Sequence, residues 1–190
     1  MASSGFSLLN VDCVRVIKRS SPHSINCALP YVLDADLQQY FDTIPHDKLM
    51  GVVAGRISDR HMLNWIKQWL SAAVVRQTRK PKRGTPQGGV ISPLLANIYL
   101  NLFDRKFRSY CRSTGLAAEL VRYADDFVIL MRGGAKRTRE KVQEMMEGLG
   151  LRLNEAKTRV IDARQGSFEF LGFSFARKIS FKSAKDDHFG

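Results

Sequence analysis

Two adjacent aspartates, Asp125 and Asp126, are flanked on both sides by strand-forming apolar residues. Side chains alternate between the two faces of a strand. Two neighbouring carboxylates in one apolar hairpin would therefore enter a core unless they occupy its turn and bind something. A divalent cation is the natural partner for such carboxylates. An isolated acidic pair is also typical of an ordinary solvated hairpin turn, so the rest of the chain has to decide between the two.

A second acidic segment follows the apolar residues 31–33. Asp34 and Asp36 are two residues apart and therefore share one face of a strand. If this strand lies beside the hairpin, Asp36 and Asp125 can converge on metal. Mg²⁺ prefers oxygen ligands and keeps waters and substrate phosphates in its shell, so a few carboxylates suffice. The pattern favours two-metal phosphoryl transfer, in which two ions clamp the attacking and leaving oxygens.

Between the two acidic segments lies a glycine-rich stretch, Arg-Gly-Thr-Pro-Gln-Gly-Gly, at residues 83–89. Its glycines allow the backbone to come close to a ligand, and Ser92 followed by Pro93 is typical of an N-cap with proline in the first turn. A loop that leads into a helix suits a nucleotide, although glycine and proline also simply mark loops. The stretch is not a Walker loop, because the Gly-Lys-Ser or Gly-Lys-Thr ending is missing.

In this order, the three segments resemble the palm of reverse transcriptases, specifically those encoded by group II introns, the intron maturases. The resemblance extends from about residue 31 to residue 175 and rests on several independent motifs in family order. Ala124, between the tyrosine and the aspartate pair, fits the intron, retron and diversity-generating branches and differs from retroviral enzymes. The Gln-Gly-x-x-x-Ser-Pro pattern at residues 87–93 argues against the diversity-generating branch.

The resemblance implies a set of metal ligands. Asp36 and Asp125 would be the catalytic, metal-binding aspartates, and Asp126 would support them. The main-chain carbonyl of Leu37 would complete a coordination shell. The implied cofactor is a pair of Mg²⁺ ions, for which Mn²⁺ could substitute.

A second implied group surrounds the incoming nucleotide. Family motifs place an aromatic steric gate five residues after the catalytic aspartate, which selects Asp36 over Asp34 because Phe41 stands there. Phe41 would lie under the sugar and exclude a 2′-hydroxyl; the plainer alternative is a core phenylalanine at a strand end. Gln87 and Gly88 would lie against the nucleotide and the template base.

Further matches concern the leaving group and the nucleic acid. Lys157 would protonate the pyrophosphate leaving group, although a single lysine is also typical of a solvated surface. Ser92 and Asn97 would belong to a helix beneath the template. Leu171 and Gly172 resemble the hairpin that grips the primer.

Composition favours a polyanionic partner. Lysine and arginine number 30 against 18 acidic residues, which gives a net charge of +12. Basic residues also cluster just before the glycine-rich loop, where they could hold phosphates, although a solvated loop has the same composition. They are Arg76, Arg79, Lys80, Lys82 and Arg83. With the resemblance, the expected partners are an RNA template, a DNA primer, deoxynucleoside triphosphates and intron RNA.

Periodicity indicates the elements that must position these residues. We expect strands at residues 31–36, 74–77, 159–162 and 168–175, a hairpin at 120–130, helices at 46–54 and 93–111, and a helix that follows a basic turn at 132–136 and ends at 148–150. A further helix follows Ser58 as its cap, and helical spacing places Trp65 and Trp69 in the core rather than on a base-stacking platform. Helices around a central hairpin favour an α+β polymerase palm with a mainly antiparallel sheet packed on helices.

The chain of 190 residues is expected to form one domain. We divide it into an atypical N-terminal segment at 1–29, a palm at 30–176, and a tail or truncated thumb at 177–190, with fingers and thumb largely missing. Three scattered cysteines indicate neither disulfides nor a zinc site and fit a reducing cytoplasm or organelle matrix. No membrane span is expected.

The leading hypothesis is RNA-templated DNA synthesis, in which a primer 3′-hydroxyl attacks the α-phosphate of a deoxynucleotide. The alternative is a noncatalytic RNA-binding or splicing module that keeps the palm but has lost polymerisation. A nucleotide cyclase on a related palm would leave the glycine-rich loop and Phe41 unexplained.

Overall fold

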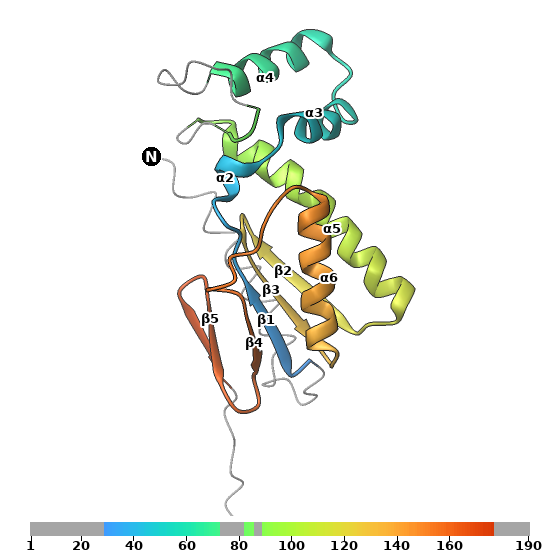
Figure 1. Cartoon of the computed structure of the whole chain (residues 1–190), viewed down its shortest axis with the longest axis vertical. Coiled ribbons are helices and arrows are strands. Elements are labelled where there is room, and N and C mark those ends of the chain that lie inside the picture. Colours follow the sequence, from blue (N-terminus) through green and yellow to red (C-terminus); the bar gives the residue numbers. More distant parts are fainter. Residues whose placement is uncertain (1–28, 73–81, 86–88, 177–190) are drawn as a thin grey trace, which may run out of the picture.

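A computed structural model describes residues 29–72, 82–85 and 89–176 (Figure 1). Its strands are β1 (Tyr31–Ala35), β2 (Ala118–Tyr123), β3 (Asp126–Met131), β4 (Arg159–Asp162), β5 (Ser167–Phe170) and β6 (Phe173–Ala176). Its helices are α2 (Tyr40–Thr43), α3 (His46–Ala54), α4 (Arg60–Ala72), α5 (Ser92–Thr114) and α6 (Ala135–Gly148).

Four strands form the main sheet in the order β2-β3-β1-β4, and β5 and β6 form a separate two-stranded sheet. Every pairing between these strands is antiparallel. The first strand of the sequence thus enters between β3 and β4, which come from the second half of the chain. The prediction of an α+β fold with a mainly antiparallel sheet is confirmed.

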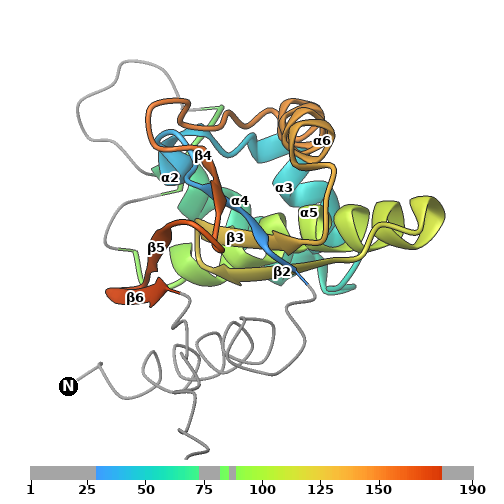
Figure 2. The same cartoon turned by 90° about the horizontal axis from the view of Figure 1, so that it is seen from below.

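Alternation along the strands separates two cores. Leu33, Phe127 and Ile129 point to one face and pack with α5 and α6 in the larger cluster. Val32 and Val128 point to the other face and pack with the phenylalanines of β5 and β6. Figure 2 shows α5 and α6 on one side of the sheet and β5 and β6 on the other. The aliphatic runs of β1 and β3 are therefore covered on both faces, as their near-continuous apolar sequence requires.

Helix α4 corrects two predictions. Asp59, rather than Ser58, caps it, because Asp59 Oδ1 accepts hydrogen bonds from the main-chain N–H groups of His61 at 2.7 Å and Met62 at 3.2 Å. Trp65 and Trp69 are 53% and 45% exposed, so their placement in the core was wrong. The helix packs on α3 along one narrow stripe, and its buried positions are Ile66 and Leu70.

Helix α5 begins one residue earlier than expected. Ile91 is the N-cap and makes no side-chain capping bond, so Ser92 is the first helical residue rather than the cap. Pro93 still lies in the first turn, and the helix continues to Thr114, where Gly115 ends it in the left-handed conformation (φ 67°). The strand predicted at 74–77 and, apart from Leu29, both predicted terminal segments lie outside the described residues.

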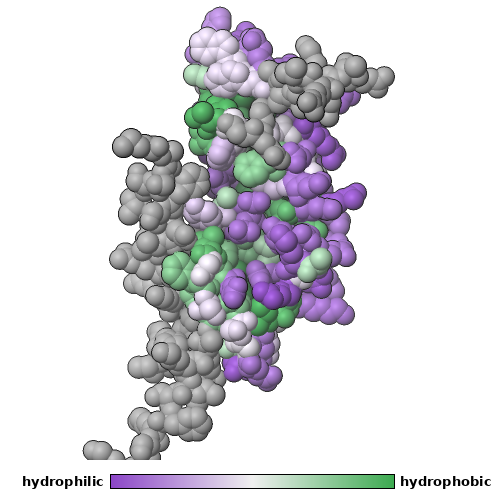
Figure 3. Space-filling model, turned by 90° about the vertical axis from the view of Figure 1, so that its left-hand side faces the viewer, coloured by the Kyte–Doolittle hydropathy of each residue, from purple (hydrophilic) through white to green (hydrophobic). Residues whose placement is uncertain are grey.

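Figure 3 shows the face of the molecule on the side of β5, where hydrophilic and hydrophobic residues lie next to each other. No helix within the described ranges is both long and apolar enough to cross a membrane.

Candidate active site

The aspartate pair lies at the tip of the hairpin formed by β2 and β3. Ala124 and Asp125 form its two-residue turn, and Asp126 begins β3 opposite Tyr123. Ala124 has a φ of 54°, in the left-handed region, which costs a residue with a Cβ about 1–2 kcal/mol. Backbone strain of this kind concentrates at functional sites, where the surrounding structure enforces it.

Strand β1 brings the other acidic segment to the same edge. Ala35 pairs with Phe127 in antiparallel register, so the next residue along β1, Asp36, comes alongside Asp126. Burial raises the pKa of Asp126, and the charges of Asp125 and Asp36 raise it further. All three of these carboxylates also act on the ammonium of Lys157, whose pKa they raise. The two acidic segments, 89 residues apart between Asp36 and Asp125, thus meet at one end of the sheet.

A cavity of about 400 Å³ opens on the face of the sheet that carries Asp34, Asp36 and Asp126. The rest of its lining comes from β1, the segment before β4, β4 itself and the β5–β6 hairpin. These residues are Ala35, Ala156, Lys157, Arg159, Glu169, Phe170 and Leu171. The carboxylates therefore face a hollow large enough for phosphate groups rather than the apolar core.

Two exposed cations balance these acids. Lys157 Nζ lies 3.1 Å from Asp36 Oδ2, to which Asn154 Nδ2 also donates a hydrogen bond at 3.2 Å. Arg159 Nε donates to Asp34 Oδ2 at 3.0 Å. The lysine and arginine side chains are 69% and 61% exposed. Burial and the charge of Asp36 together raise the pKa of Asp34, although Arg159 lowers it.

The described residues contain no group of three or more His, Cys, Asp or Glu side chains arranged to hold a metal ion. Mg²⁺ is commonly bound through one or two carboxylates while waters and substrate phosphates supply the other ligands. Oxygen donors of this kind are present in Asp36, Asp125 and Asp126. Leu37, whose carbonyl is a predicted ligand, is buried next to Asp36 and bridges to Leu153. The chemistry of the donor set therefore fits Mg²⁺.

The predicted sugar gate lies on α2, directly after β1. Phe41 is half-buried, with its ring centroid 5.6 Å from that of Tyr40. Its main-chain carbonyl accepts a hydrogen bond of 2.7 Å from Thr85 N, so the start of the glycine-rich loop lies against α2. Gly84 makes this approach possible, because its φ is 89° and a Cβ there would meet Asp42 O at 3.0 Å.

The predicted primer-grip residues form the turn between β5 and β6. Leu171 and Gly172 have φ angles of 54° and 77°, and Leu171 lines the carboxylate cavity. Two successive residues with positive φ are typical of a tight hairpin turn. The hairpin thus lies beside the cavity that carries Asp36 and Asp126.

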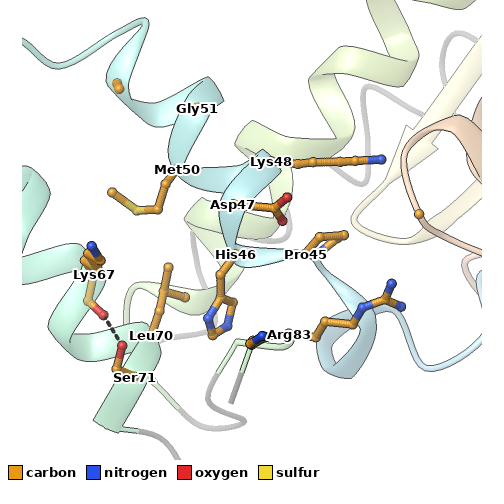
Figure 4. Close-up of a pocket in the computed structure, with 13 residues that line it drawn as sticks. Pro45, His46, Asp47, Lys48, Met50, Gly51, Lys67, Leu70, Ser71 and Arg83 are labelled. Carbon is orange, nitrogen blue, oxygen red and sulfur yellow. Dashed lines mark hydrogen bonds between the residues drawn. The ribbon is translucent and has the colours of Figure 1, made fainter. Parts of the chain in front are cut away.

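The basic cluster is described only in part. Arg76, Arg79, Lys80, Gln87 and Gly88 lie outside the described residues. The two remaining basic residues, Lys82 and Arg83, are exposed and line a second cavity of about 950 Å³ between α3 and α4, together with His46, Lys48 and Lys67 (Figure 4). The segment carrying Lys82 is tied to α3, because His46 N donates to Lys82 O at 3.1 Å. This cavity is separate from the one that carries the aspartates.

Sequence reasoning missed a polar network behind the acidic turn. Arg122 on β2 contacts Asp104 and Asn97 on α5, as well as the main chain of Ala124. Asn97 was assigned to the template helix, and its side chain accepts a hydrogen bond from Arg122. Asp104 is seven residues further along the same face of α5, within an apolar stripe. The acidic residue at an otherwise apolar helical position was the sequence signal that could have revealed the network.

Comparison with known proteins gives consistent matches. The model of a family described as reverse transcriptase (RNA-dependent DNA polymerase) matches residues 12–175. Protein YkfC of Escherichia coli K12 is 38% identical over 183 residues, covering 79% of this chain and 48% of that protein. The group II intron-encoded protein LtrA of Lactococcus lactis is 40% identical over 77 residues, covering 40% of this chain and 13% of LtrA.

Solved structures agree at the level of the fold. The telomerase of Candida tropicalis, in complex with a fragment of telomeric RNA, aligns with a TM-score of 0.66 and 18% identity. That alignment covers 93% of this chain and 34% of the telomerase chain. The chain also spans about half the length, or less, of the curated relatives named above.

Proposed function

This chain belongs to the reverse transcriptase family, and we propose on that basis that it carries the palm, at residues 30–176, of an RNA-directed DNA polymerase of the group II intron type. The observation that best supports the proposal is the meeting of Asp36 with Asp125 and Asp126 at one end of an antiparallel sheet. Acids from two distant segments share one edge of the sheet there, and the β2–β3 turn that carries Asp125 is strained at Ala124.

In the proposed reaction, the 3′-hydroxyl of a primer attacks the α-phosphate of a deoxynucleoside triphosphate. A P–O bond forms between the primer oxygen and the α-phosphorus. The bond between the α-phosphorus and the oxygen that bridges it to the β-phosphorus breaks, and pyrophosphate leaves. Asp36 and Asp125 would hold two Mg²⁺ ions, with Asp126 and the Leu37 carbonyl as supporting oxygen donors. When bound, the ions would supply charge stabilisation to the attacking and leaving oxygens.

Lys157 is the proposed proton donor to the leaving pyrophosphate. Its ammonium pairs with Asp36 at 3.1 Å but is 69% exposed, so a phosphate in the cavity could replace the carboxylate as its partner. Lysine is ordinarily protonated at neutral pH, and Asp36 raises the pKa of Lys157 further, so the side chain carries the proton that a donor needs.

Phe41 is the proposed gate against ribonucleotides. The hydrogen bond from Thr85 N to Phe41 O supports this proposal, because it holds Phe41 beside the start of the loop that would contact the nucleotide through Gln87 and Gly88. An aromatic ring at this junction would lie against the sugar and leave no room for a 2′-hydroxyl.

RNA template and DNA primer are the proposed partners, with intron RNA as the natural template. Lys82 and Arg83, together with Arg76, Arg79 and Lys80, would contact phosphates, and Ser92 and Asn97 would lie beneath the template. Leu171 and Gly172 would contact the primer from the edge of the carboxylate cavity. Charge contacts of this kind weaken steeply with salt. The proposed location is a bacterial cytoplasm or an organelle matrix.

Primer extension on an RNA template tests the proposal. We expect Mg²⁺-dependent DNA synthesis by the chain and a loss of at least about 100-fold in Asp125→Asn, because a ligand of the reacting centre is removed. Asp59→Asn is the matched control, since asparagine caps a helix as well as aspartate does. Equal activity in Asp125→Asn and the unaltered chain would reject the assignment. In the same assay, Phe41→Ala is expected to admit ribonucleotides.

A noncatalytic RNA-binding module is the second candidate. It is favoured by one observation: Lys157 Nζ lies 3.1 Å from Asp36 Oδ2 and so pairs with a carboxylate that a metal ion would otherwise bind. Salt-sensitive binding to intron RNA, without extension under any Mg²⁺ concentration, would select this alternative.

A further inference from the structure

We propose that Arg122 is a positioning residue that fixes the turn carrying Asp125 to helix α5. The catalytic consequence rests on the proposed function, whereas the fixation of the turn does not. Arg122 lies on β2, three residues before Asp125, and its side chain points to the face of the sheet opposite the carboxylate cavity.

Four hydrogen bonds hold the guanidinium. Nε and Nη2 form a two-point contact with Asp104, at 2.9 Å to Oδ1 and 2.7 Å to Oδ2. Nη1 donates both to Asn97 Oδ1 at 2.8 Å and to the main-chain carbonyl of Ala124 at 2.8 Å. The planar guanidinium thus joins two turns of α5 to the tip of the hairpin, which an ammonium could not do.

The Arg122–Asp104 pair is largely buried and its charges are balanced, whereas Asn97 lies at the exposed end of the network. The side chains of Arg122 and Asp104 are only 12% and 11% exposed, so water competes weakly for their hydrogen bonds. Phe127, opposite Arg122 on β3, packs against Phe103 of α5 with ring centroids 5.2 Å apart. The hairpin is therefore held against α5 by an aromatic contact and a charged one at the same level.

The carbonyl that Arg122 holds belongs to the strained residue of the turn. Ala124 has a φ of 54°, a conformation that an alanine adopts only when its surroundings enforce it. The hydrogen bond to Nη1 fixes the peptide that follows this residue, which is the peptide of Asp125 itself. Loss of the bond would allow the turn to relax and Asp125 to move relative to Asp36.

Mn²⁺ binding, measured by the paramagnetic resonance of the free ion, tests this role without requiring catalysis. The key variant is the double substitution Arg122→Met and Asp104→Leu. Replacing both members of a buried ion pair with apolar residues is commonly neutral or stabilising, so the chain should remain folded. Arg122→Lys is the conservative variant, and Arg105→Gln, on the exposed side of α5, is the control.

We expect the double variant to keep its melting temperature but to bind Mn²⁺ about 10–100-fold more weakly, as the loss of a residue behind a ligand usually does. Arg122→Lys should lie between the double variant and the unaltered chain, and Arg105→Gln should match the unaltered chain. Hydrogen exchange should accelerate at residues 124–127 in the double variant and remain unchanged in β1.

Unchanged Mn²⁺ affinity in the folded double variant would overturn the proposal, as would an equal loss in Arg105→Gln. If the double variant unfolds, hydrogen exchange in Arg122→Lys decides, and unchanged exchange at 124–127 overturns the proposal. If the unaltered chain binds Mn²⁺ but extends no primer, the proposed function is wrong. The Mn²⁺ affinities of the variants would still test the positioning role of Arg122. Absence of Mn²⁺ binding in the unaltered chain would overturn the proposed function and the catalytic consequence for Arg122, and hydrogen exchange at residues 124–127 would then decide whether Arg122 fixes the turn.

Discussion

The two faces of the sheet treat charge differently at its acidic end. On the α5 face, Arg122 and Asp104 are almost completely removed from water and bonded at two points. On the opposite face, Lys157 and Arg159 remain largely in solvent while they pair with Asp36 and Asp34. A buried ion pair resists separation, because separation would leave an unpaired charge in a medium of low dielectric constant. In an exposed pair, ions from the solvent can readily replace either partner. The first face therefore maintains the architecture, and the second can accept a cation and phosphates.

The strongest test of this contrast is Asp104→Leu. The substitution leaves the guanidinium of Arg122 buried without its carboxylate, so we expect the free energy of unfolding to fall by about 3–5 kcal/mol. Urea denaturation followed by circular dichroism measures the change. Adding Arg122→Met to Asp104→Leu should restore most of the loss. A change below about 1 kcal/mol, typical of surface pairs, would show that the two faces do not differ.

Tyr99 extends the contrast to an uncharged group on α5. Its hydroxyl donates to Leu149 O, and burial raises its pKa from 10 to about 12. The folded chain therefore keeps this proton between pH 10 and pH 12 while the unfolded chain loses it, so stability should fall as the pH rises through that range. Tyr99→Phe should cost about 1 kcal/mol near neutral pH and show a shallower alkaline loss. Urea denaturation at a series of pH values checks both; parallel curves would contradict the burial effect.

Lys157→Met probes the exposed face. Because the lysine competes with cations for Asp36, its removal should increase Mn²⁺ affinity, by less than about tenfold since exposed pairs are weak. Primer extension should nevertheless decrease, because Lys157 is the proposed proton donor to pyrophosphate. The pair of measurements separates the two roles. Lys141→Met, on the exposed side of α6, serves as control. A weaker Mn²⁺ affinity in Lys157→Met would contradict competition.

The smallest effect is expected for Asp34→Asn. Burial raises the pKa of Asp34 despite its hydrogen bond from Arg159, so the ionised carboxylate is disfavoured in the folded chain. Its contribution to stability therefore decreases as the pH rises through the folded-state pKa. We expect the neutral asparagine to leave the free energy of unfolding at neutral pH unchanged or raised by less than about 1 kcal/mol. Thermal denaturation checks this; a clear loss would mean that Asp34 is structurally required.

Local patterns predicted much of this fold. The apolar residues at 31–33 and on both sides of the aspartate pair predicted a strand and a hairpin that the structure contains, and α3 has the predicted bounds. The relation between the two acidic segments and the glycine-rich loop came from their order along the chain, which resembles that of the family, because no local pattern connects them. The start of the glycine-rich loop lies against α2, where Thr85 N donates a hydrogen bond to Phe41 O.

The failures share a cause, which is dependence on a neighbour that the sequence does not specify. Trp65 and Trp69 have helical spacing, but α4 packs on α3 through the face that carries Ile66 and Leu70, and the tryptophans lie on the exposed part of the helix. The Arg122 contact to Asp104 spans 18 residues and forms only because β2 packs back on α5. Lys157 reaches Asp36 only because the chain following α6 returns to β1.

The contact between Gly84 and Asp42 has a consequence for how variants of this protein would behave. Any side chain at position 84 would meet the main chain of Asp42 and push the loop away from α2. The hydrogen bond from Thr85 N to the main-chain carbonyl of Phe41 would then be lost. Under the proposed roles of Phe41 and the loop, sugar selection and nucleotide binding would then change together, so substitution at this position could alter neither property alone.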